Sequence, residues 1–304
     1  MLWRRKKERT YRASGYTMFV DGIKIHYLRA GEGRTVVFLH GGLLCADDFK
    51  DCVQIAARRG YTAIAFDRPG YGFSESGSKA WTPESQAALI NEALKQLNIK
   101  KAILVAHSWS GTMALSYALQ YSAETDGIVL VAAAMYKEGY PAEHGDWLSK
   151  IVTTPVIGQL LMQTLYRTVL GHSLAKNMVK ATFAPEKAPP GYAEKTMALG
   201  FRPAHFLANR KDVLAFPSSA QKWSRSYRDV RMPVQILIGE NDPFGVNDQA
   251  LRVKGTIPHA EIHQLPHAGH MIPQLHPMEV LNAIERLSFG EKIITQSENI
   301  EGRK

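Results

Sequence analysis

The amino-acid sequence predicts an α/β fold with a mostly parallel, doubly wound sheet and an inserted helical segment. Apolar, β-branched runs alternate along the chain with stretches of helical periodicity, as expected for parallel strands joined by crossover helices. The length of 304 residues and the 45% hydrophobic composition suffice for one large α/β core. The strand-like runs are 35–39, 62–66, 102–106, 127–132, 234–238 and 261–265.

A serine directly follows the third of these runs. In ILVAHSWSG (103–111) an apolar strand leads into Ser108, and the helix-forming TMALSYALQ comes next. This pattern is typical of a nucleophile exposed on a strand-to-helix turn, where the residues two before and two after must be small. Ala106 and Ser110 occupy those positions instead of the usual glycines. Taken alone, Ser108 could equally be a helix cap.

Partners for this serine follow in chain order. VQILI ends in GENDP, which places Asp242 just past a buried strand, and HAGHMIP places His270 in the loop after the last strand. An imidazole must accept the proton of an attacking serine, and a carboxylate must orient that imidazole. Glu240 and His267 are the competing acid and base, and Asp242 alone could be a simple turn residue.

The first predicted strand runs into a glycine pair. In TVVFLHGGLL (35–44) the strand leads to His40 and two glycines. Acyl transfer needs backbone N–H groups aimed at the developing oxyanion. We expect these donors to be the N–H of Trp109, directly after the nucleophile, and that of Gly42. His40 and His107 are expected to be structural.

With these motifs, the chain resembles the α/β-hydrolase superfamily, in its serine-nucleophile, esterase-like branch with a helical cap. The resemblance rests on FVDGIKIHYLRAGEG, FLHGG, AIAFDRPGYGFS, LVAHSWSG, ILIGENDP and HAGHMIP. It implies hydrolysis of carboxylic esters through an acyl-enzyme, with Ser108, Asp242 and His270 as the triad and with no metal or cofactor. Asp67 and Arg68 are expected to be scaffold residues of the loop beside the site. Relatives that are dehalogenases or epoxide hydrolases carry aspartate at the position of Ser108.

The resemblance also divides the chain. We expect a basic tail at 1–17, a catalytic domain at 18–136 and 230–289, a helical cap insertion at 137–229, and a second tail at 290–304. Ile300–Arg303 resembles a protease-cleavage linker, so the end of that tail is expected to be foreign to the native protein.

The cap is expected to supply apolar walls to a pocket for a small apolar ester. The residues predicted to bind substrate are Leu43, Met162, Phe201 and Phe206. Most apolar residues of a helical cap serve its own small core, so this prediction competes with a purely structural role. Leu161, Met178, Phe183 and Met197 are further apolar residues of the insertion.

Positive charge concentrates in two regions. Residues 1–12 carry six Lys/Arg against one acid, and the insertion carries 13 against seven. An anionic membrane surface is one partner that would suit this distribution, whereas a solvated tail is the simpler explanation. Nucleic acid is not expected as a partner. No run approaches a membrane span, and the two cysteines, Cys45 and Cys52, suggest neither a disulfide framework nor zinc. We therefore expect a cytoplasmic protein, with peripheral membrane contact as the alternative.

Other functions use the same residues. Carbon–carbon bond hydrolysis and cofactor-free perhydrolysis share the triad, although relatives that cleave vinylogous diketones usually have a longer first glycine loop than HGGLL. Proline iminopeptidases share the HGG and Ser-Trp pairs, but their loop continues Pro-Gly. A non-catalytic small-molecule-binding protein on the same fold is the alternative of another class.

Overall fold

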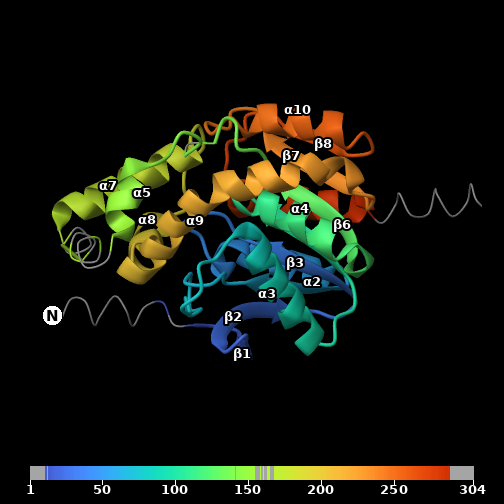
Figure 1. Ribbon diagram of the computed structural model, residues 1–304, viewed down its shortest axis with the longest axis horizontal. Coiled ribbons are helices and arrows are strands. Elements are labelled where there is room, and N and C mark those ends of the chain that lie inside the picture. The colour runs from blue at the N-terminus through green and yellow to red at the C-terminus, as the bar shows by residue number, and fades with distance from the viewer. Residues whose placement is uncertain are drawn as a thin grey trace, which may run out of the picture.

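The computed structural model describes residues 11, 13–140, 142–154, 158, 160, 163–164 and 168–287. Within these residues, eight strands form one sheet in the order β1-β2-β4-β3-β5-β6-β7-β8 (Figure 1). The strands are β1 (Tyr16–Val20), β2 (Ile23–Ala30), β3 (Arg34–Leu39), β4 (Tyr61–Phe66), β5 (Ala102–His107), β6 (Thr125–Val131), β7 (Val234–Gly239) and β8 (Glu261–Leu265). Each of the six predicted strands is present, with ends within two residues of those expected, and the fold class is confirmed.

The sheet brings the ends of its central strands to one edge. β1–β2 and β2–β4 pair antiparallel, and the other neighbours pair parallel. In the parallel part, Leu39 at the end of β3 is level with Phe66 of β4 and Ala106 of β5. Because the chain leaves every parallel strand at this edge, the loops after β3, β4, β5, β7 and β8 gather there.

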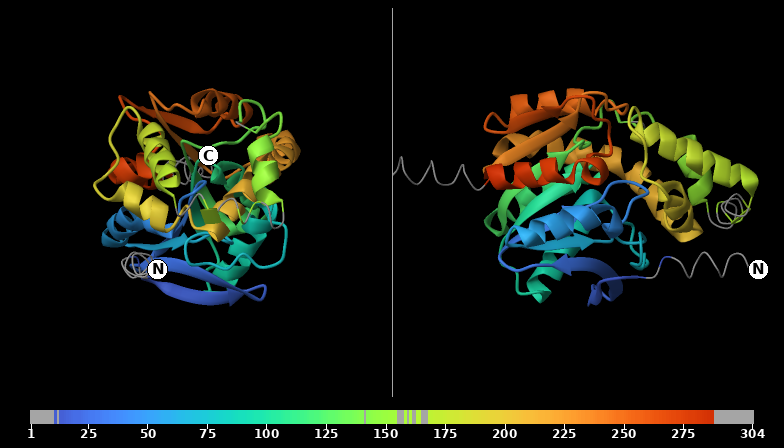
Figure 2. Two further views of the ribbon diagram at one scale, coloured as in Figure 1. Left: turned by 90° about the vertical axis from the view of Figure 1, so that its left-hand side faces the viewer. Right: turned by 180° about the vertical axis from the view of Figure 1, so that it is seen from behind.

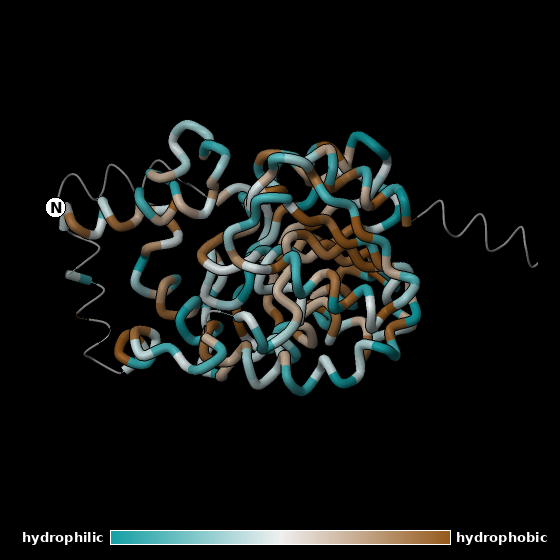
Figure 3. The backbone as a smooth tube through the Cα atoms, turned by 90° about the horizontal axis from the view of Figure 1, so that it is seen from above, coloured by the Kyte–Doolittle hydropathy of each residue, from teal (hydrophilic) through white to brown (hydrophobic). Residues whose placement is uncertain are grey.

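Helices cover both faces of the sheet. They are α2 (Lys50–Arg58), α3 (Pro83–Gln96), α4 (Ser110–Gln120), α5 (Trp147–Thr153), α7 (Val169–Phe183), α8 (Tyr192–Ala198), α9 (Pro203–Trp223), α10 (Val246–Thr256), α11 (Ile272–Leu275) and the helical residues 277–287. Short 3₁₀ turns are η1 (Ala46–Phe49), η2 (Ser122–Glu124) and η3 (Ser224–Asp229). Successive side chains of one strand alternate between two cores: Val37 packs with α3 and α4, whereas Val36 packs with α2 and 277–287. The most hydrophobic segments gather in the middle of the α/β body (Figure 3).

The segment between β6 and β7 forms a helical layer beyond this sheet edge. Helices α5, α7 and α8 project from the α/β body, and α9 runs from them back across α4 (Figures 1 and 2). The Lys195 ammonium fixes α8 to η1, lying 2.6 Å from Asp47 Oδ2 and 3.0 Å from Asp48 Oδ1. The second half of α9 differs from the rest of this segment, because Phe216 and Ala220 are fully buried in the core that the sheet forms with α3 and α4. The last part of the predicted insertion thus packs as part of the α/β body.

Two further sequence predictions concern covalent and membrane features. Cys45 and Cys52 are both free and buried. Among the described residues, no helix combines the length and apolar character that crossing a bilayer would require. The basic residues of the predicted N-terminal tail lie outside the described residues, as does the tail at 290–304.

Candidate active site

Ser108 occupies a strained turn between β5 and α4. Its φ of +55° lies in the left-handed region that non-glycine residues rarely adopt. The turn is held by Ser108 N–H donating to Val131 O (3.1 Å) and by Ser108 O accepting from Ala134 N–H (2.9 Å). Packing around it is tight, since a Cβ on Gly111 would lie 2.6 Å from Ala134 O. This geometry projects the serine side chain from the sheet edge, as the strand–serine–helix pattern predicts.

The two positions that depart from the glycine pattern are accommodated in different ways. Ala106 is fully buried within β5, in the core between the sheet and helices α3 and α4. Ser110 is also fully buried, and its hydroxyl donates to His40 O at 2.6 Å. The larger Ser110 side chain therefore connects the serine turn to the loop after β3.

The three residues predicted as a triad lie in one hydrogen-bonded chain. Ser108 Oγ is 3.0 Å from His270 Nε2, and His270 Nδ1 is 2.6 Å from Asp242 Oδ2. Since a carboxylate only accepts, His270 Nδ1–H donates to Asp242 and Nε2 is free to accept from the serine hydroxyl. The Asp242 side chain is fully buried, and its other oxygen accepts from Phe244 N–H (2.9 Å). This arrangement can remove the serine proton and stabilise the resulting imidazolium.

The competing acid and base lie elsewhere. His267 N–H donates to Glu240 Oε2 (2.9 Å), and the His267 ring is almost wholly exposed. Their ionisable groups are 3.7 Å apart on the surface. The structure thus pairs Glu240 with His267 and brings neither to Ser108.

The predicted oxyanion donors flank the serine. Gly42 and Trp109 line one cavity together with Ser108 and His270. Trp109 is the N-cap of α4, where backbone N–H groups lack helical partners and the helix dipole favours negative charge. The loop after β3 approaches closely, since a Cβ on Gly41 would lie 2.8 Å from Ser108 Cβ. An oxyanion formed at Ser108 would therefore lie between two backbone segments.

The cavity has a volume of about 290 Å³ and is covered by the helical layer. Its polar wall includes Tyr140, Asp146, Asn209 and Arg210. Arg210 Nη1 is 3.4 Å from Asp146 Oδ2, and its Nε and Nη2 donate to Asn209 Oδ1. Apolar walls predominate, and they include Leu43, Leu44, Met178, Val179, Phe183, Val213 and Phe244.

The predicted substrate-binding residues are only partly found here. Leu43 lines the cavity, whereas Met162, like Leu161, lies outside the described residues. Phe201 and Phe206 are not among the described residues that line this cavity, and their role in substrate binding stays a prediction. Their rings lie 5.5 Å apart and pack on each other at the junction of α8 and α9.

Helix α9 carries the polar residues that sequence reasoning missed. Its buried positions include His205, Asn209 and Asp212, spaced four and three residues apart. Polar residues on the buried stripe of an amphipathic helix need partners, so this spacing is a signal that could have identified them. Asn209 belongs to the cavity wall, and Asp212 lies behind it.

Two histidines near the serine are buried and neutral. Burial and the neighbouring His270 lower the pKa of His107 to about 3, although its ring N–H donates to His270 O (3.0 Å). Burial and the Arg68 charge hold the pKa of His40 well below its usual value. Both residues act as fixed hydrogen-bonding groups, in agreement with the structural role expected for them.

The helical layer also contacts the loop of the candidate base. Gly269 N–H, adjacent to His270, donates to Glu186 Oε2 (3.0 Å), and Glu186 Oε1 lies 2.8 Å from His276 Nε2. Glu186 therefore fixes both sides of the loop that presents His270. No cluster of three or more His, Cys, Asp or Glu side chains in the described ranges is placed to bind a metal ion.

Comparison with known proteins assigns the family. The profile of the alpha/beta hydrolase fold matches residues 34–277, so the chain belongs to the alpha/beta hydrolase family. A 2-hydroxy-6-oxononadienedioate/2-hydroxy-6-oxononatrienedioate hydrolase of Paraburkholderia phymatum is 28% identical over 272 residues, covering 84% of this chain and 89% of the relative.

Solved structures agree on the fold. Cfl2 from Burkholderia cenocepacia has a TM-score of 0.75 at 20% identity, covering 90% of this chain and 94% of that chain. A thermophilic esterase from Thermogutta terrifontis has a TM-score of 0.72 at 19% identity, and the match covers 90% of this chain and 97% of the esterase chain. At these identities the likeness concerns the fold alone.

Proposed function

We propose that this protein is a serine hydrolase that cleaves small, largely apolar carboxylic esters through an acyl-enzyme. The observation that carries the proposal is the Ser108–His270–Asp242 chain of hydrogen bonds opening into a mostly apolar cavity. An apolar wall suits an acyl or alcohol chain, and a few polar groups suffice to orient it.

In the proposed reaction, Ser108 Oγ attacks the ester carbonyl while its proton passes to His270 Nε2. Asp242 stabilises the imidazolium, and the N–H groups of Gly42 and Trp109 bind the oxyanion. His270 then protonates the leaving alcohol as the C–O bond breaks, leaving acyl-Ser108. A water molecule, deprotonated by His270, attacks the acyl group and releases the carboxylic acid and free serine.

A second candidate is carbon–carbon bond hydrolysis by the same residues. The 2-hydroxy-6-oxononadienedioate named for the relative contains ketone, enol and carboxylate groups but no ester, so hydrolytic cleavage of that compound breaks a C–C bond. Arg210 supports this candidate, because it lines the cavity and its guanidinium could exchange its present partners, Asp146 and Asn209, for a substrate carboxylate.

The decisive experiment compares wild type with Ser108→Ala. Each protein is treated with a fluorophosphonate probe and measured by intact mass, then assayed with p-nitrophenyl acetate, butyrate and octanoate and with a synthetic 2-hydroxy-6-oxodienoate. We expect one adduct and ester turnover in wild type and neither in Ser108→Ala. Faster turnover of the dienoate than of any ester would favour the second candidate. Folded wild type without an adduct would favour a binding protein.

A further inference from the structure

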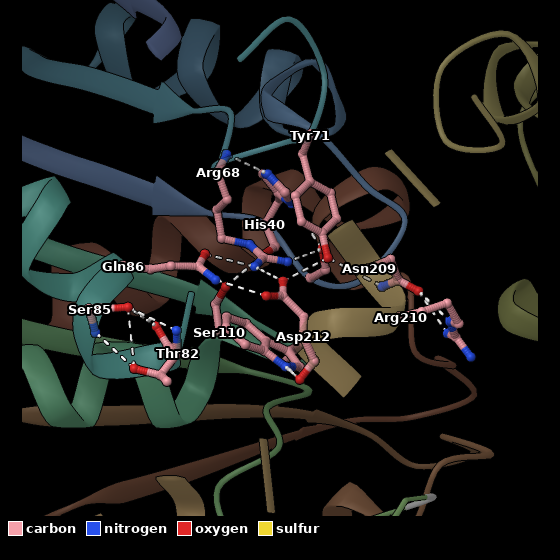
Figure 4. A network of polar contacts seen from close by, with 12 residues as sticks. His40, Arg68, Tyr71, Thr82, Ser85, Gln86, Ser110, Asn209, Arg210 and Asp212 are labelled. Carbon is pink, nitrogen blue, oxygen red and sulfur yellow. Dashed lines mark hydrogen bonds and ion pairs between the residues drawn. The ribbon is translucent and has the colours of Figure 1, made fainter. Parts of the chain in front are cut away.

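A buried ion pair lies next to Trp109, the residue that follows Ser108. The Arg68 guanidinium, from the loop after β4, pairs with Asp212 of α9 (Figure 4). Asp212 also accepts from Tyr71 OH (2.7 Å) and Gln86 Nε2 (2.9 Å), so both of its oxygens are bonded. A buried ion pair is seldom more stabilising than apolar residues of the same volume. We therefore look for the function of this ion pair in the other groups that bind the Arg68 guanidinium.

The remaining Arg68 donors bind the glycine loop after β3. Nε donates to His40 O and Nη2 donates to Gly41 O, both at 3.0 Å. The His40 ring adds a third bond. Its Nε2 accepts from the Arg68 backbone N–H (3.0 Å), so the ring proton is on Nδ1 and donates to Gly41 O (2.8 Å). Two N–H groups thus bind the single carbonyl of Gly41.

That carbonyl shares a peptide unit with the first proposed oxyanion donor. In a planar trans peptide the N–H of Gly42 points opposite to the C=O of Gly41. Because the C=O faces Arg68 and His40, the N–H faces away from them, and Gly42 lines the cavity beside Ser108. Hydrogen bonds to a carbonyl also polarise its amide and strengthen the N–H as a donor.

The second donor, Trp109, contacts the backbone carbonyl of Asp212 and the Arg68 guanidinium. The Trp109 indole N–H donates to Asp212 O (3.1 Å). The Arg68 guanidinium lies 4.2 Å from the centre of the Trp109 ring, within cation–π range. Arg68 therefore contacts both backbone segments that flank the nucleophile, and the Asp212 backbone carbonyl contacts the second of them.

We propose that Arg68, held by Asp212, is the positioning residue of the oxyanion hole and couples it to helix α9. The same helix presents Asn209, Arg210 and Val213 to the cavity, so α9 contributes to the substrate wall as well as to the support of Arg68. This inference rests on the proposed serine-hydrolase function.

The test uses Arg68→Gln and Arg68→Lys in the full chain. Fluorophosphonate labelling to completion counts active sites, and kcat and KM for p-nitrophenyl butyrate are expressed per labelled site. We expect Arg68→Gln to lower kcat about 10²-fold, the loss typical of one oxyanion donor, with KM little changed. Affinity for a trifluoromethyl ketone, whose adduct carries the oxyanion, should fall by the same factor as kcat/KM.

Two readouts separate this role from a merely structural one. The pH profile of kcat/KM should keep its midpoint, because the triad is untouched, and Arg68→Lys should recover part of kcat, because an ammonium can still bind one carbonyl. Lys222→Gln is the matched control. Lys222 lies on α9, as Asp212 does, and its ion pair with Glu84 of α3 is at the surface, so the variant should retain wild-type kcat.

The outcomes are distinguishable. Arg68→Gln with kcat per labelled site within about twofold of wild type overturns the inference, and so does a loss that resides only in the number of labelled sites. If the Arg68 variants do not fold, Asp212→Asn, which removes the charge but keeps the shape, is judged by the same ratio. Wild type that neither labels nor turns over ester overturns the proposed function as well.

Discussion

Replacing His107 with asparagine should reduce the sensitivity of the fold to acid. His107 is fully buried, and burial next to His270 lowers the pKa of its imidazole to about 3. In the unfolded chain the same group has an ordinary pKa near 6.5. Below pH 6.5 His107 therefore binds a proton in the unfolded state but stays neutral in the folded state. The stability linked to His107 is therefore complete above pH 6.5 and is lost as the pH falls towards 3.

The size of the effect follows from this difference. Each pH unit well between the two pKa values changes the free energy of unfolding by about 1.4 kcal/mol. The unfolded imidazole is only half protonated at pH 6.5, so acidification from pH 6.5 to 4.5 removes about 2 kcal/mol. The asparagine side chain is not protonated anywhere in this pH range. Whatever its stability at neutral pH, the His107→Asn variant should lose about 2 kcal/mol less than wild type over this interval.

Urea unfolding followed by circular dichroism at pH 7.5, 6.5, 5.5 and 4.5 gives the free energy of unfolding of both proteins at each pH. The buried His40 and His205 also have lowered pKa values because of burial, but they titrate alike in both proteins and cancel in the difference. His144→Asn is the control, since the same change is made at an exposed side chain. Stability curves of wild type and His107→Asn that run parallel from pH 7.5 to 4.5 would refute the reasoning.

Two other substitutions test the site. Asp242→Asn should lower kcat about 10⁴-fold with the fold intact, because the amide favours the wrong His270 tautomer. Glu240→Gln is its control, and its kcat should remain within about twofold of wild type. Equal losses of kcat in both variants would contradict the assignment of Asp242 as the acid. Gly41→Ala should lower kcat by about 10²-fold, because its Cβ would lie 2.8 Å from Ser108 Cβ and displace the nucleophile. Gly255→Ala in α10, where a Cβ meets open space, is its control, and comparable kcat for the two variants would argue against close packing at the serine.

The parts of the site that sequence reasoning located are local. Ser108, Asp242 and His270 each follow a strand whose apolar run is visible in the chain, and parallel strands bring such loops to one edge. The choice of Asp242 over Glu240 also depends on local position after the strand. Periodicity and turn signals therefore carried most of the fold and placed these three side chains together.

The parts that were missed depend on contacts between distant segments. Phe201 and Phe206 were assigned to the pocket because they are apolar residues of a cap, but periodicity cannot tell which neighbour covers an apolar face. Arg68 was expected to be a scaffold residue of its loop, and what sequence reasoning missed is its partner Asp212, 144 residues away in the chain. Only the packing of α9 onto the sheet edge brings those charges together.

The Arg68–Asp212 pair has a consequence for engineering by domain exchange. Arg68 belongs to the α/β body, and Asp212 belongs to the segment between β6 and β7. Each of these two parts alone would therefore contain one buried charge without its partner. A cap grafted from a relative to change substrate preference would leave a buried guanidinium uncompensated unless the donor helix carried an acid at the place of Asp212. Graft boundaries are therefore best placed before Asn209, so that the recipient keeps its own carboxylate and exchanges only the outer helices.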